Sequence, residues 1–345
     1  MEAPILQVQS LRKYFPCQRS MADRLFHRRR KFVHAVDDVS FTINRGEILA
    51  LVGESGSGKT TIGMNVLGLQ EPTGGQILFD GYDVTRWARG DLESVKSDDV
   101  ATKKRREQIL ELRRRAQIIF QDPYESLNPR QKVFETIVEP LEIHRIGRSA
   151  EEKRERVRKA MEESGLAPAE HFWDRYPDHL SGGQRQRLVI AAALVLEPEL
   201  LVADEPVSML DVSIRAEILG LLNELREERN ITILYTTHDL ATAGIFTDRM
   251  AVMYLGRIVE LGPTQAVLSE PRHPYTRALV SVVPAPNPRR RRKQVVLEGE
   301  VPNPIDLPSG CRFHPRCPQA QDECSQIDPQ LVPVSEDHQV ACLHA

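Results

Sequence analysis

The feature that most constrains the fold of this chain is the glycine-rich segment GESGSGKT at residues 53–60. It fits the pattern G-x-x-x-x-G-K-[ST], and it lies between a short apolar run, residues 47–52, and an apolar helix start. Glycines let the backbone fold around a polyphosphate with its N–H groups pointing inward, and the following helix adds the positive end of its dipole. The sequence therefore predicts a nucleotide phosphate loop between a buried strand and a helix.

The phosphate loop assigns roles to individual side chains. Lys59 is expected to reach the β- and γ-phosphates, and the Thr60 hydroxyl is expected to bind Mg²⁺. The predicted nucleotide-binding residues of this segment are Gly53, Glu54, Ser55, Gly56, Ser57, Gly58, Lys59, Thr60 and Thr61.

Two carboxylates follow a second apolar run, residues 200–203. Asp204 is the candidate that completes the metal site. Alternation along the strand end points Glu205 away from it, so Glu205 is assigned as the general base for an attacking water. An Asp-Glu pair at a strand end is by itself usually a solvated turn, so this assignment depends on the phosphate loop sharing the same sheet.

Strand and helix patterns alternate along the chain, which favours an α/β fold with a mostly parallel sheet flanked by helices. Further predicted strands are residues 5–10, 36–43, 77–79, 116–120 and 231–236, and predicted helices are residues 151–164, 183–196 and 212–229. Between the first two strands, residues 16–32 are interpreted as an inserted loop. Residues 83–115 are dense in charge and predict a solvated helix or an insertion.

Composition excludes several classes of protein. The chain is 41% hydrophobic and 28% charged, and its 46 basic and 49 acidic residues leave a net charge of −3, which fits neither a nucleic-acid-coating nor a disordered chain. The longest apolar run, residues 188–196, is far shorter than the ~20 residues of a membrane-spanning helix. We also find no secretory signal and expect a cytoplasmic location.

A third motif, LSGGQRQR at residues 180–187, opens a helix and has no strand before it. A serine and two glycines at a helix N-terminus make another anion site. One chain with two separated half-sites for the same phosphates implies that two chains pair head to tail.

Taken in order, these motifs resemble the ATP-binding-cassette (ABC) family over roughly residues 5–262. The motifs that carry the resemblance are the phosphate loop, Gln121 after an apolar strand, residues 180–184, Asp204 with Glu205, residues 208–211, and His238. The resemblance implies an ATPase with a P-loop nucleotide-binding domain of ABC type, containing an antiparallel β subdomain and a helical signature subdomain at about residues 122–185.

The resemblance also implies roles position by position. Phe15 would stack on adenine, with Tyr14 as the alternative, and Gln121 would contact Mg²⁺ and the attacking water. Asp211 would stabilise the dimer interface, and His238 would contact the γ-phosphate. The implied catalytic residues are Glu205, His238, Gln121 and Lys59. The implied Mg²⁺ ligands are Thr60, Gln121 and Asp204. The residues implied to bind the partner's nucleotide are Ser181, Gly182, Gly183 and Gln184.

Two further segments resemble those of oligopeptide/dipeptide importer ATPases: FQDPYESLNPR at residues 120–130 and HPYTRAL at residues 273–279. They are similar to the second of two paralogous ATPases. The resemblance implies peptide import driven by ATP-dependent dimer closure, at the cytoplasmic face of the inner membrane. Implied partners are the paralogous ATPase in a heterodimer, two transmembrane permease subunits and an extracytoplasmic solute-binding protein, with no nucleic acid. Alternatives are import of nickel or an oligosaccharide, or a soluble cassette protein that does not transport.

The residue composition of the chain changes near Glu270, where proline becomes frequent. We therefore predict a nucleotide-binding domain at residues 1–270 and a small loop-rich C-terminal domain at residues 271–345. The insertion from Trp87 to Glu111 is longer than expected and receives no role.

Four cysteines cluster in the C-terminal domain: Cys311, Cys317, Cys324 and Cys342. Four soft ligands fit tetrahedral zinc or an iron–sulfur cube, although the paired C-x2-C spacing of zinc ribbons is missing. Residues 310–318 resemble the tail of peptide-importer ATPases, some of which hold a [4Fe-4S] cluster there. The prediction is a [4Fe-4S] cluster, with zinc and unliganded thiols or a labile disulfide as alternatives. Cys17, in the arginine-rich insert, is interpreted as incidental.

Overall fold

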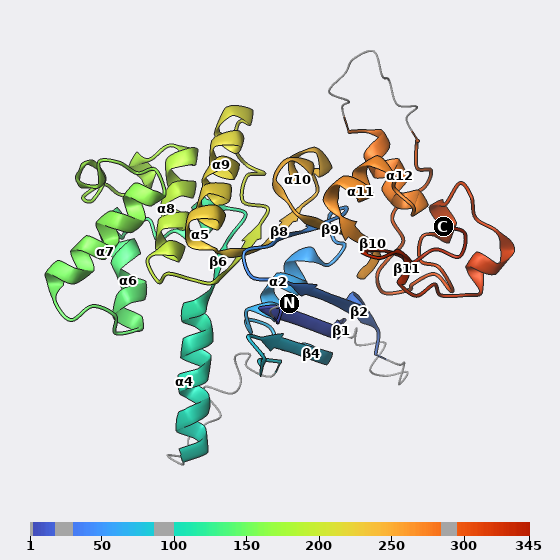
Figure 1. The fold of residues 1–345 in the computed structure, drawn as a ribbon, viewed down its shortest axis with the longest axis horizontal. Helices are drawn as coiled ribbons and strands as arrows, with labels where there is room; N and C mark the ends of the chain where they lie inside the picture. The colour runs from blue at the N-terminus through green and yellow to red at the C-terminus, as the bar shows by residue number, and fades with distance from the viewer. Residues whose placement is uncertain (1–2, 18–29, 86–99, 284–294) are drawn as a thin grey trace. The chain divides into compact units, whose positions relative to one another are not determined.

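The computed structural model describes residues 3–17, 30–85, 100–283 and 295–345 (Figure 1). Most of the two predicted insertions, residues 16–32 and Trp87 to Glu111, therefore lies outside the described residues. By contacts the chain divides into two compact units. The first consists of residues 1–44, 48–89 and 236–345, and the second of residues 45–47 and 90–235.

An antiparallel sheet opens the first unit, with strand order β2-β1-β4-β5. Its strands are β1 (Leu6–Pro16), β2 (Phe32–Ile43), β4 (Gly74–Phe79) and β5 (Tyr82–Asp83). Apolar side chains such as Leu6 and Val8 alternate with exposed or half-buried ones, so one face of the sheet is buried. This sheet confirms the predicted strands at the N-terminus and the predicted antiparallel β subdomain.

The other strands of the first unit follow the order β11-β12-β10-β9-β3. They are β3 (Ile48–Val52), β9 (Arg249–Tyr254), β10 (Arg257–Pro263), β11 (Val332–Ser335) and β12 (His338–Val340). Strand β3 is parallel to β9, whereas the other neighbours are antiparallel, so the sheet is mixed. Strands β9 and β10 were not predicted from the sequence, because their side chains are buried on both faces and show no period-two pattern.

Within the described residues, four α-helices and two short 3₁₀ helices also belong to the first unit. They are α2 (Lys59–Val66), α10 (Leu240–Phe246), α11 (Thr264–Ser269), α12 (Pro274–Ser281), η3 (His314–Arg316) and η4 (Asp322–Ser325). Most of the C-terminal residues form loops, but β12 pairs with β10 and ties them to the sheet. The predicted domain boundary near Glu270 stays a prediction.

The second unit contains the strands β6 (Ala116–Ile119) and β7 (Leu200–Asp204), which are parallel, and most of β8 (Thr232–Thr237), which neighbours β7. All five residues of β7 are buried, as the apolar run predicted. Its helices are α4 (Val100–Arg115), α5 (Pro123–Ser126), α6 (Val133–Ile143), α7 (Ala150–Glu163), α8 (Gly182–Leu194) and α9 (Val212–Arg229), with short 3₁₀ helices η1 (Ala169–His171) and η2 (Pro177–His179).

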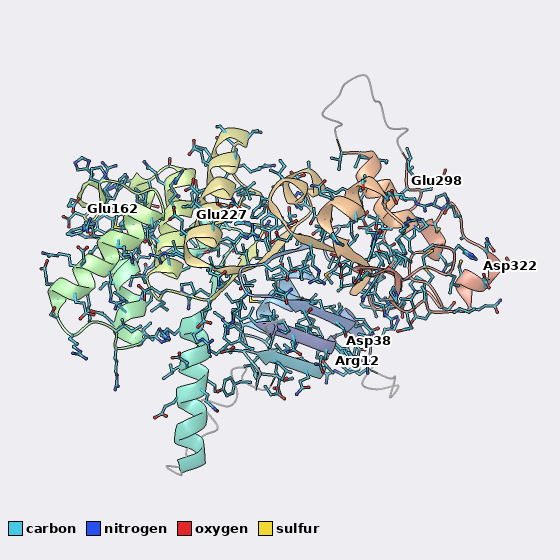
Figure 2. The ribbon with its side chains drawn as sticks, in the orientation of Figure 1. Arg12, Asp38, Glu162, Glu227, Glu298 and Asp322 are labelled. Carbon is cyan, nitrogen blue, oxygen red and sulfur yellow. The ribbon has the colours of Figure 1, made fainter. Side chains whose placement is uncertain are left out.

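Charged side chains lie on the surface of both units (Figure 2). Glu162 and Glu227 are exposed on helices of the second unit, and Glu298 and Asp322 are exposed in the C-terminal part of the first. Helix α7 is a surface helix, as predicted, because only one stripe of it, including Val157, is buried. Among the described residues, no helix has the length and apolar content needed to cross a bilayer.

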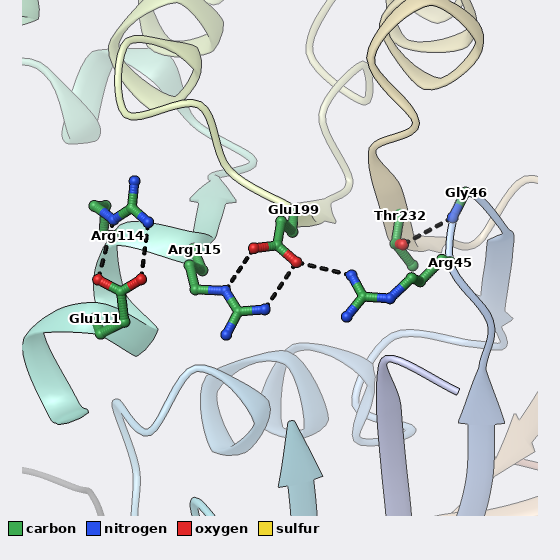
Figure 3. Close-up of polar contacts among 7 residues, drawn as sticks. All are labelled: Arg45, Gly46, Glu111, Arg114, Arg115, Glu199 and Thr232. Atoms are coloured by element: carbon green, nitrogen blue, oxygen red, sulfur yellow. Dashed lines mark hydrogen bonds and ion pairs between the residues drawn. The ribbon is translucent and has the colours of Figure 1, made fainter. Parts of the chain in front are cut away.

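Ion pairs hold the starts of β6 and β7 together in the second unit (Figure 3). Glu199 accepts two hydrogen bonds from Arg115, at 2.6 and 2.8 Å, and one from Arg45 at 2.8 Å. The bonds from Arg115 are the largest influence that lowers the pKa of Glu199 to about 2. Since Arg115 precedes β6 and Glu199 precedes β7, this network fixes the two parallel strands relative to each other at the ends opposite Gln121 and Glu205.

Candidate functional site

The phosphate loop lies between β3 and α2, where the sequence predicted it. Gly56 and Gly58 have φ values of 78° and 105°, which side-chain-bearing residues rarely adopt. A Cβ atom at Gly53 would lie 2.3 Å from the Met253 carbonyl oxygen, and one at Gly58 would lie 2.2 Å from the Ala35 carbonyl oxygen. Backbone atoms of Met253 and Ala35 therefore pack directly against the loop, and only glycine fits at positions 53 and 58.

Lys59 is the first residue of α2, and only 5% of its surface is exposed. Its Nζ donates to the carbonyl oxygens of Gly53, at 2.8 Å, and Glu54, at 3.1 Å. A buried ammonium group that is held by the loop's own carbonyls faces the phosphate-binding residues, as expected for a cation that binds β- and γ-phosphates. Thr60, the predicted Mg²⁺ ligand, is exposed one residue further on.

The loop also has partners that no local sequence pattern indicated. The Arg316 guanidinium forms a two-pronged ion pair with the Glu54 carboxylate, with N–O distances of 3.1 and 3.4 Å. The backbone N–H of Glu54 donates to the Tyr275 hydroxyl at 3.2 Å. Both partners lie in segments that the family resemblance had marked, but their separation from the loop, 262 and 221 residues, left no local signal.

The two candidates for adenine stacking differ in their surroundings. Tyr14 donates its hydroxyl to Asp37, and its ring centroid lies 4.3 Å from that of His34. Desolvation, followed by the bond to Asp37, raises the pKa of Tyr14 to about 12. Phe15 is half-buried, with the Lys13 ammonium 5.0 Å from its ring centroid. Among the described residues, the Tyr14 ring thus has both a hydrogen-bonded hydroxyl and a ring contact, and the stacking of Phe15 on adenine stays a prediction.

Gln121 and Glu205 are brought together in the second unit. Gln121 follows β6 and Glu205 follows β7; because parallel strands end at the same edge of a sheet, the two residues are neighbours. The Gln121 Nε2 donates to the Glu205 Oε2 at 3.4 Å. Asp204, the last residue of β7, is 5% exposed.

The orientation of Glu205 has a different cause from the strand alternation that we expected. Its φ is 44°, so the strand geometry ends at Asp204 and the backbone turns left-handed at Glu205. The turn is held by Ser208, whose N–H and hydroxyl both donate to the Glu205 carbonyl oxygen, at 3.2 and 3.1 Å. A turn, rather than the strand itself, therefore aims the carboxylate.

The serine-glycine motif opens α8, as predicted. Ser181 is the N-cap: its hydroxyl accepts from the Gln184 N–H at 3.3 Å, and its own N–H donates to the Gln184 side chain at 3.0 Å. A Cβ atom at Gly183 would lie 2.7 Å from Cγ2 of Ile214 in α9, so a larger residue would push the two helices apart. The helix N-terminus is thus well defined, and the role of Gly182 and its neighbours in phosphate binding stays a prediction.

Two predicted residues lie at the starts of other helices. Asp211 is exposed at the N-terminus of α9, and its side chain does not cap that helix. His238 is exposed directly after β8, and Asp239 beside it caps α10 by accepting from the Ala241 and Thr242 N–H groups at 2.9 and 3.3 Å. Exposure is compatible with the roles in interface and γ-phosphate contacts that the resemblance implied.

The predicted site residues are divided between the two units. The phosphate loop, Phe15 and His238 belong to the first unit, whereas Gln121, residues 181–184, Asp204, Glu205 and Asp211 belong to the second.

The prediction of a [4Fe-4S] cluster or a zinc ion at the four cysteines is wrong. Cys311, Cys317, Cys324 and Cys342 do line one pocket, but within the described ranges no group of three or more histidine, cysteine, aspartate or glutamate side chains is arranged to hold a metal ion. Burial raises the pKa of Cys311 to about 11 and also raises those of Cys317 and Cys342, so these thiols are protonated at neutral pH in this structure. The sequence correctly indicated that the four cysteines lie close together, but their spacing did not establish the geometry of the sulfur atoms.

Comparisons with known proteins identify the family. Residues 36–208 match the family model described as ABC transporter, and residues 259–324 match the model described as oligopeptide/dipeptide transporter, C-terminal region. The chain belongs to the ABC transporter family. The resemblance predicted from the motifs and the predicted P-loop fold of ABC type are both confirmed.

Relatives align with this member of the ABC transporter family along almost its whole length. The dipeptide transport ATP-binding protein DppF of Haemophilus influenzae is 42% identical over 341 residues, which are 99% of this chain and 97% of DppF. The oligopeptide transport ATP-binding protein AppF of Bacillus subtilis is 43% identical over 98% of this chain and 96% of AppF. A dimeric structure of the ATP-binding cassette MJ0796 with ADP and phosphate has a TM-score of 0.60 and 26% identity, over 75% of this chain and 98% of that one.

Proposed function

We propose that this chain is the ATP-hydrolysing subunit of an importer of di- and oligopeptides. The observation that carries the proposal is the extent of the similarity. Relatives named for dipeptide and oligopeptide transport align over both the cassette and the C-terminal region, and that region has a family model of its own. A cassette of another branch would match in the first part alone.

The residues of the first unit bind ATP in this proposal. The glycine-rich loop surrounds the phosphates with backbone N–H groups, and Lys59 neutralises charge on the β- and γ-phosphates. Phe15 stacks on the adenine, and His238 contacts the γ-phosphate. Two observations support this role: Gly56 and Gly58 take backbone conformations that glycine favours, and backbone of β9 and β2 packs directly against Gly53 and Gly58.

The residues of the second unit carry out the hydrolysis. Glu205 accepts a proton from the attacking water, and Gln121, bonded to it at 3.4 Å, orients both. Gln121 and Asp204 are oxygen donors of the kind that Mg²⁺ prefers and would help to hold it; the hydroxyl of Thr60, in the phosphate loop, is the third proposed ligand. A bound Mg²⁺ ion would offset the charge that develops on the transferred phosphoryl group.

Two chains form the complete site. The Ser181 end of α8 in one chain faces the γ-phosphate held by the loop of the other, and Asp211 stabilises the interface. Loss of the γ-phosphate removes charge-assisted contacts, so the dimer opens. The dimeric form of the similar cassette MJ0796 supports this arrangement. The proposed partners are a paralogous ATPase, two transmembrane permease subunits at the cytoplasmic face of the membrane, and an extracytoplasmic solute-binding protein.

The test is transport by a reconstituted complex. The full chain, the paralogous ATPase and the two permease subunits are placed in vesicles, and ATP hydrolysis is measured with the binding protein and with a tetrapeptide, Ni²⁺ or an oligosaccharide. Stimulation by the peptide together with peptide uptake is expected. Stimulation by Ni²⁺ or the oligosaccharide alone would overturn the peptide assignment, and a complex with no ATP hydrolysis would overturn the motor function.

A further inference from the structure

An ion pair joins the C-terminal region to the phosphate loop, in addition to the contact of the Tyr275 hydroxyl with the Glu54 N–H. Arg316, at the end of η3, pairs in parallel fork geometry with the carboxylate of Glu54, the second residue of the loop. The Arg316 side chain is only 8% exposed, whereas that of Glu54 is 30% exposed. A bidentate arginine–carboxylate pair with one buried member has a defined geometry and is stronger than an ordinary surface pair.

Arg316 is held in place by a rigid surrounding. Its Nη1 also donates to the Tyr254 hydroxyl at 3.4 Å, and the guanidinium lies 5.9 Å from the Tyr254 ring centroid. Phe313, three residues earlier and 1% exposed, packs its ring 5.3 Å from that of Tyr254 and 5.4 Å from that of Tyr275. Tyr275 is the residue whose hydroxyl accepts the Glu54 N–H. The Arg316 guanidinium and the Tyr275 hydroxyl, which both contact Glu54, thus lie against one cluster of aromatic rings.

A second arginine anchors this segment to the sheet. Arg312, four residues before Arg316 and 8% exposed, donates to the Leu255 carbonyl oxygen and to the carboxylate of Asp37. Asp37 also accepts the hydroxyl of Tyr14, next to the adenine-stacking candidate. Arg312 thus fixes the segment that carries Arg316 to the first unit at two points.

The charge of Glu54 has a direct consequence for ATP. The loop folds around a polyphosphate, and a free carboxylate in that loop would repel the phosphates. Pairing with Arg316 cancels the negative charge and fixes the loop backbone next to it. We propose that Arg316 is a positioning residue for ATP binding, through which the C-terminal region sets the affinity of the phosphate loop for nucleotide by neutralising the Glu54 carboxylate. This inference rests on the proposed ATPase function.

The experiment measures the equilibrium affinity of MgATP for the full chain by calorimetry in four forms: wild type, Arg316→Gln, Glu54→Gln and the double variant. Arg316→Gln leaves an unpaired carboxylate and is expected to weaken ATP binding about fivefold to tenfold. Glu54→Gln leaves an unpaired guanidinium and is expected to tighten binding by a similar factor. The double variant is expected to lie within about twofold of wild type, since neither charge remains. A purely structural role for the pair would instead weaken binding in all three variants.

Two further variants complete the design. Arg316→Lys keeps the charge but loses the fork, and it is expected to bind ATP within about threefold of wild type. Arg115→Gln is the matched control, because it breaks another bidentate arginine–carboxylate pair, with Glu199 in the second unit, that involves no residue of the loop (Figure 3). Its affinity for ATP is expected to equal that of wild type.

Several outcomes would overturn the inference. These are an Arg316→Gln variant that binds ATP as tightly as wild type, a double variant as weak as Arg316→Gln, or an Arg115→Gln variant weakened to the same degree. If Arg316→Gln does not fold, Glu54→Gln decides, because no gain in affinity there overturns the inference as well. A wild-type chain that binds no ATP overturns the proposed function instead, so the two failures are distinguishable.

Discussion

Replacement of Glu260 by alanine should detach the C-terminal segments from the sheet. Glu260 lies in β10 with none of its surface exposed. Its carboxylate accepts from the backbone N–H groups of Arg272, at 2.8 Å, and His273, at 2.9 Å, and it contacts the His338 Nε2 at 2.8 Å. One buried side chain therefore joins β10 to the start of α12 and to β12.

The magnitude follows from the groups left behind. The Glu260→Ala variant would leave two backbone donors and one imidazole nitrogen without their acceptor in a buried site. Each such group costs about 1–3 kcal/mol, and entry of water into the cavity relieves part of the cost, so the expected loss is about 3–5 kcal/mol. Against a total stability of about 5–15 kcal/mol for a typical domain, the effect is large.

Urea unfolding of the full chain, followed by tyrosine and tryptophan fluorescence, measures this loss. Limited proteolysis at neutral pH is expected to cut the C-terminal residues of the variant first. Glu260→Gln keeps one carbonyl oxygen as an acceptor and should lose about half as much free energy. Glu298→Ala, at an exposed carboxylate, is the matched control and should unfold like wild type (Figure 2).

An unchanged urea midpoint for Glu260→Ala would refute the reasoning, since it would mean that the three contacts contribute no net free energy. Equal losses in Glu260→Ala and Glu298→Ala would also refute it, because burial would then be irrelevant.

Three further predictions address the chemistry and the pH dependence. Glu205→Gln removes the proposed base and should lower the rate of ATP hydrolysis by about 100-fold or more while ATP affinity changes little, and single-turnover kinetics with a binding titration check both. Burial lowers the pKa of His273 from 6.5 to about 3. As pH drops below 6.5, the imidazole therefore gains a proton in the unfolded chain before it does so in the folded chain. The free energy of unfolding should fall by about 1.4 kcal/mol per pH unit in this range. His273→Asn, which keeps a side-chain acceptor for the Tyr275 N–H, should flatten this slope in urea titrations at pH 7 to 5. The pKa of Glu199 is lowered from 4.5 to about 2, chiefly by Arg115. The contribution of Glu199 to the free energy of unfolding is therefore full above pH 4.5 and is lost as pH falls towards 2. Glu199→Gln should abolish this acid-dependent part of the stability.

The phosphate loop, β7 and the start of α8 were predictable from the sequence because each is a local pattern. A glycine-rich turn after a buried strand and a serine cap before Gly182 depend on residues within one or two turns of one another. Strands β9 and β10 were not predictable in this way, because burial on both faces removes the alternation that marks a strand.

The cysteine cluster shows the limit of a spacing argument. Four thiols close in sequence indicated a metal site, and the described structure places all four around one pocket without a metal-binding arrangement. A sequence shows which side chains could bind a metal ion. Whether their sulfur atoms point to one centre depends on the fold of the segment from Cys311 to Cys342.

The sequence by itself determined that this chain binds a nucleotide and belongs to the ABC family, because those properties reside in short segments whose backbone conformation is set by glycines, caps and apolar runs. Only the tertiary structure decided which distant residues support the site. The pairing of Arg316 with Glu54 spans 262 residues. Glu260, in β10, likewise contacts residues of two later segments, the start of α12 and β12. Contacts at that separation are chosen by the packing of the whole sheet, since no local preference of either residue specifies its partner.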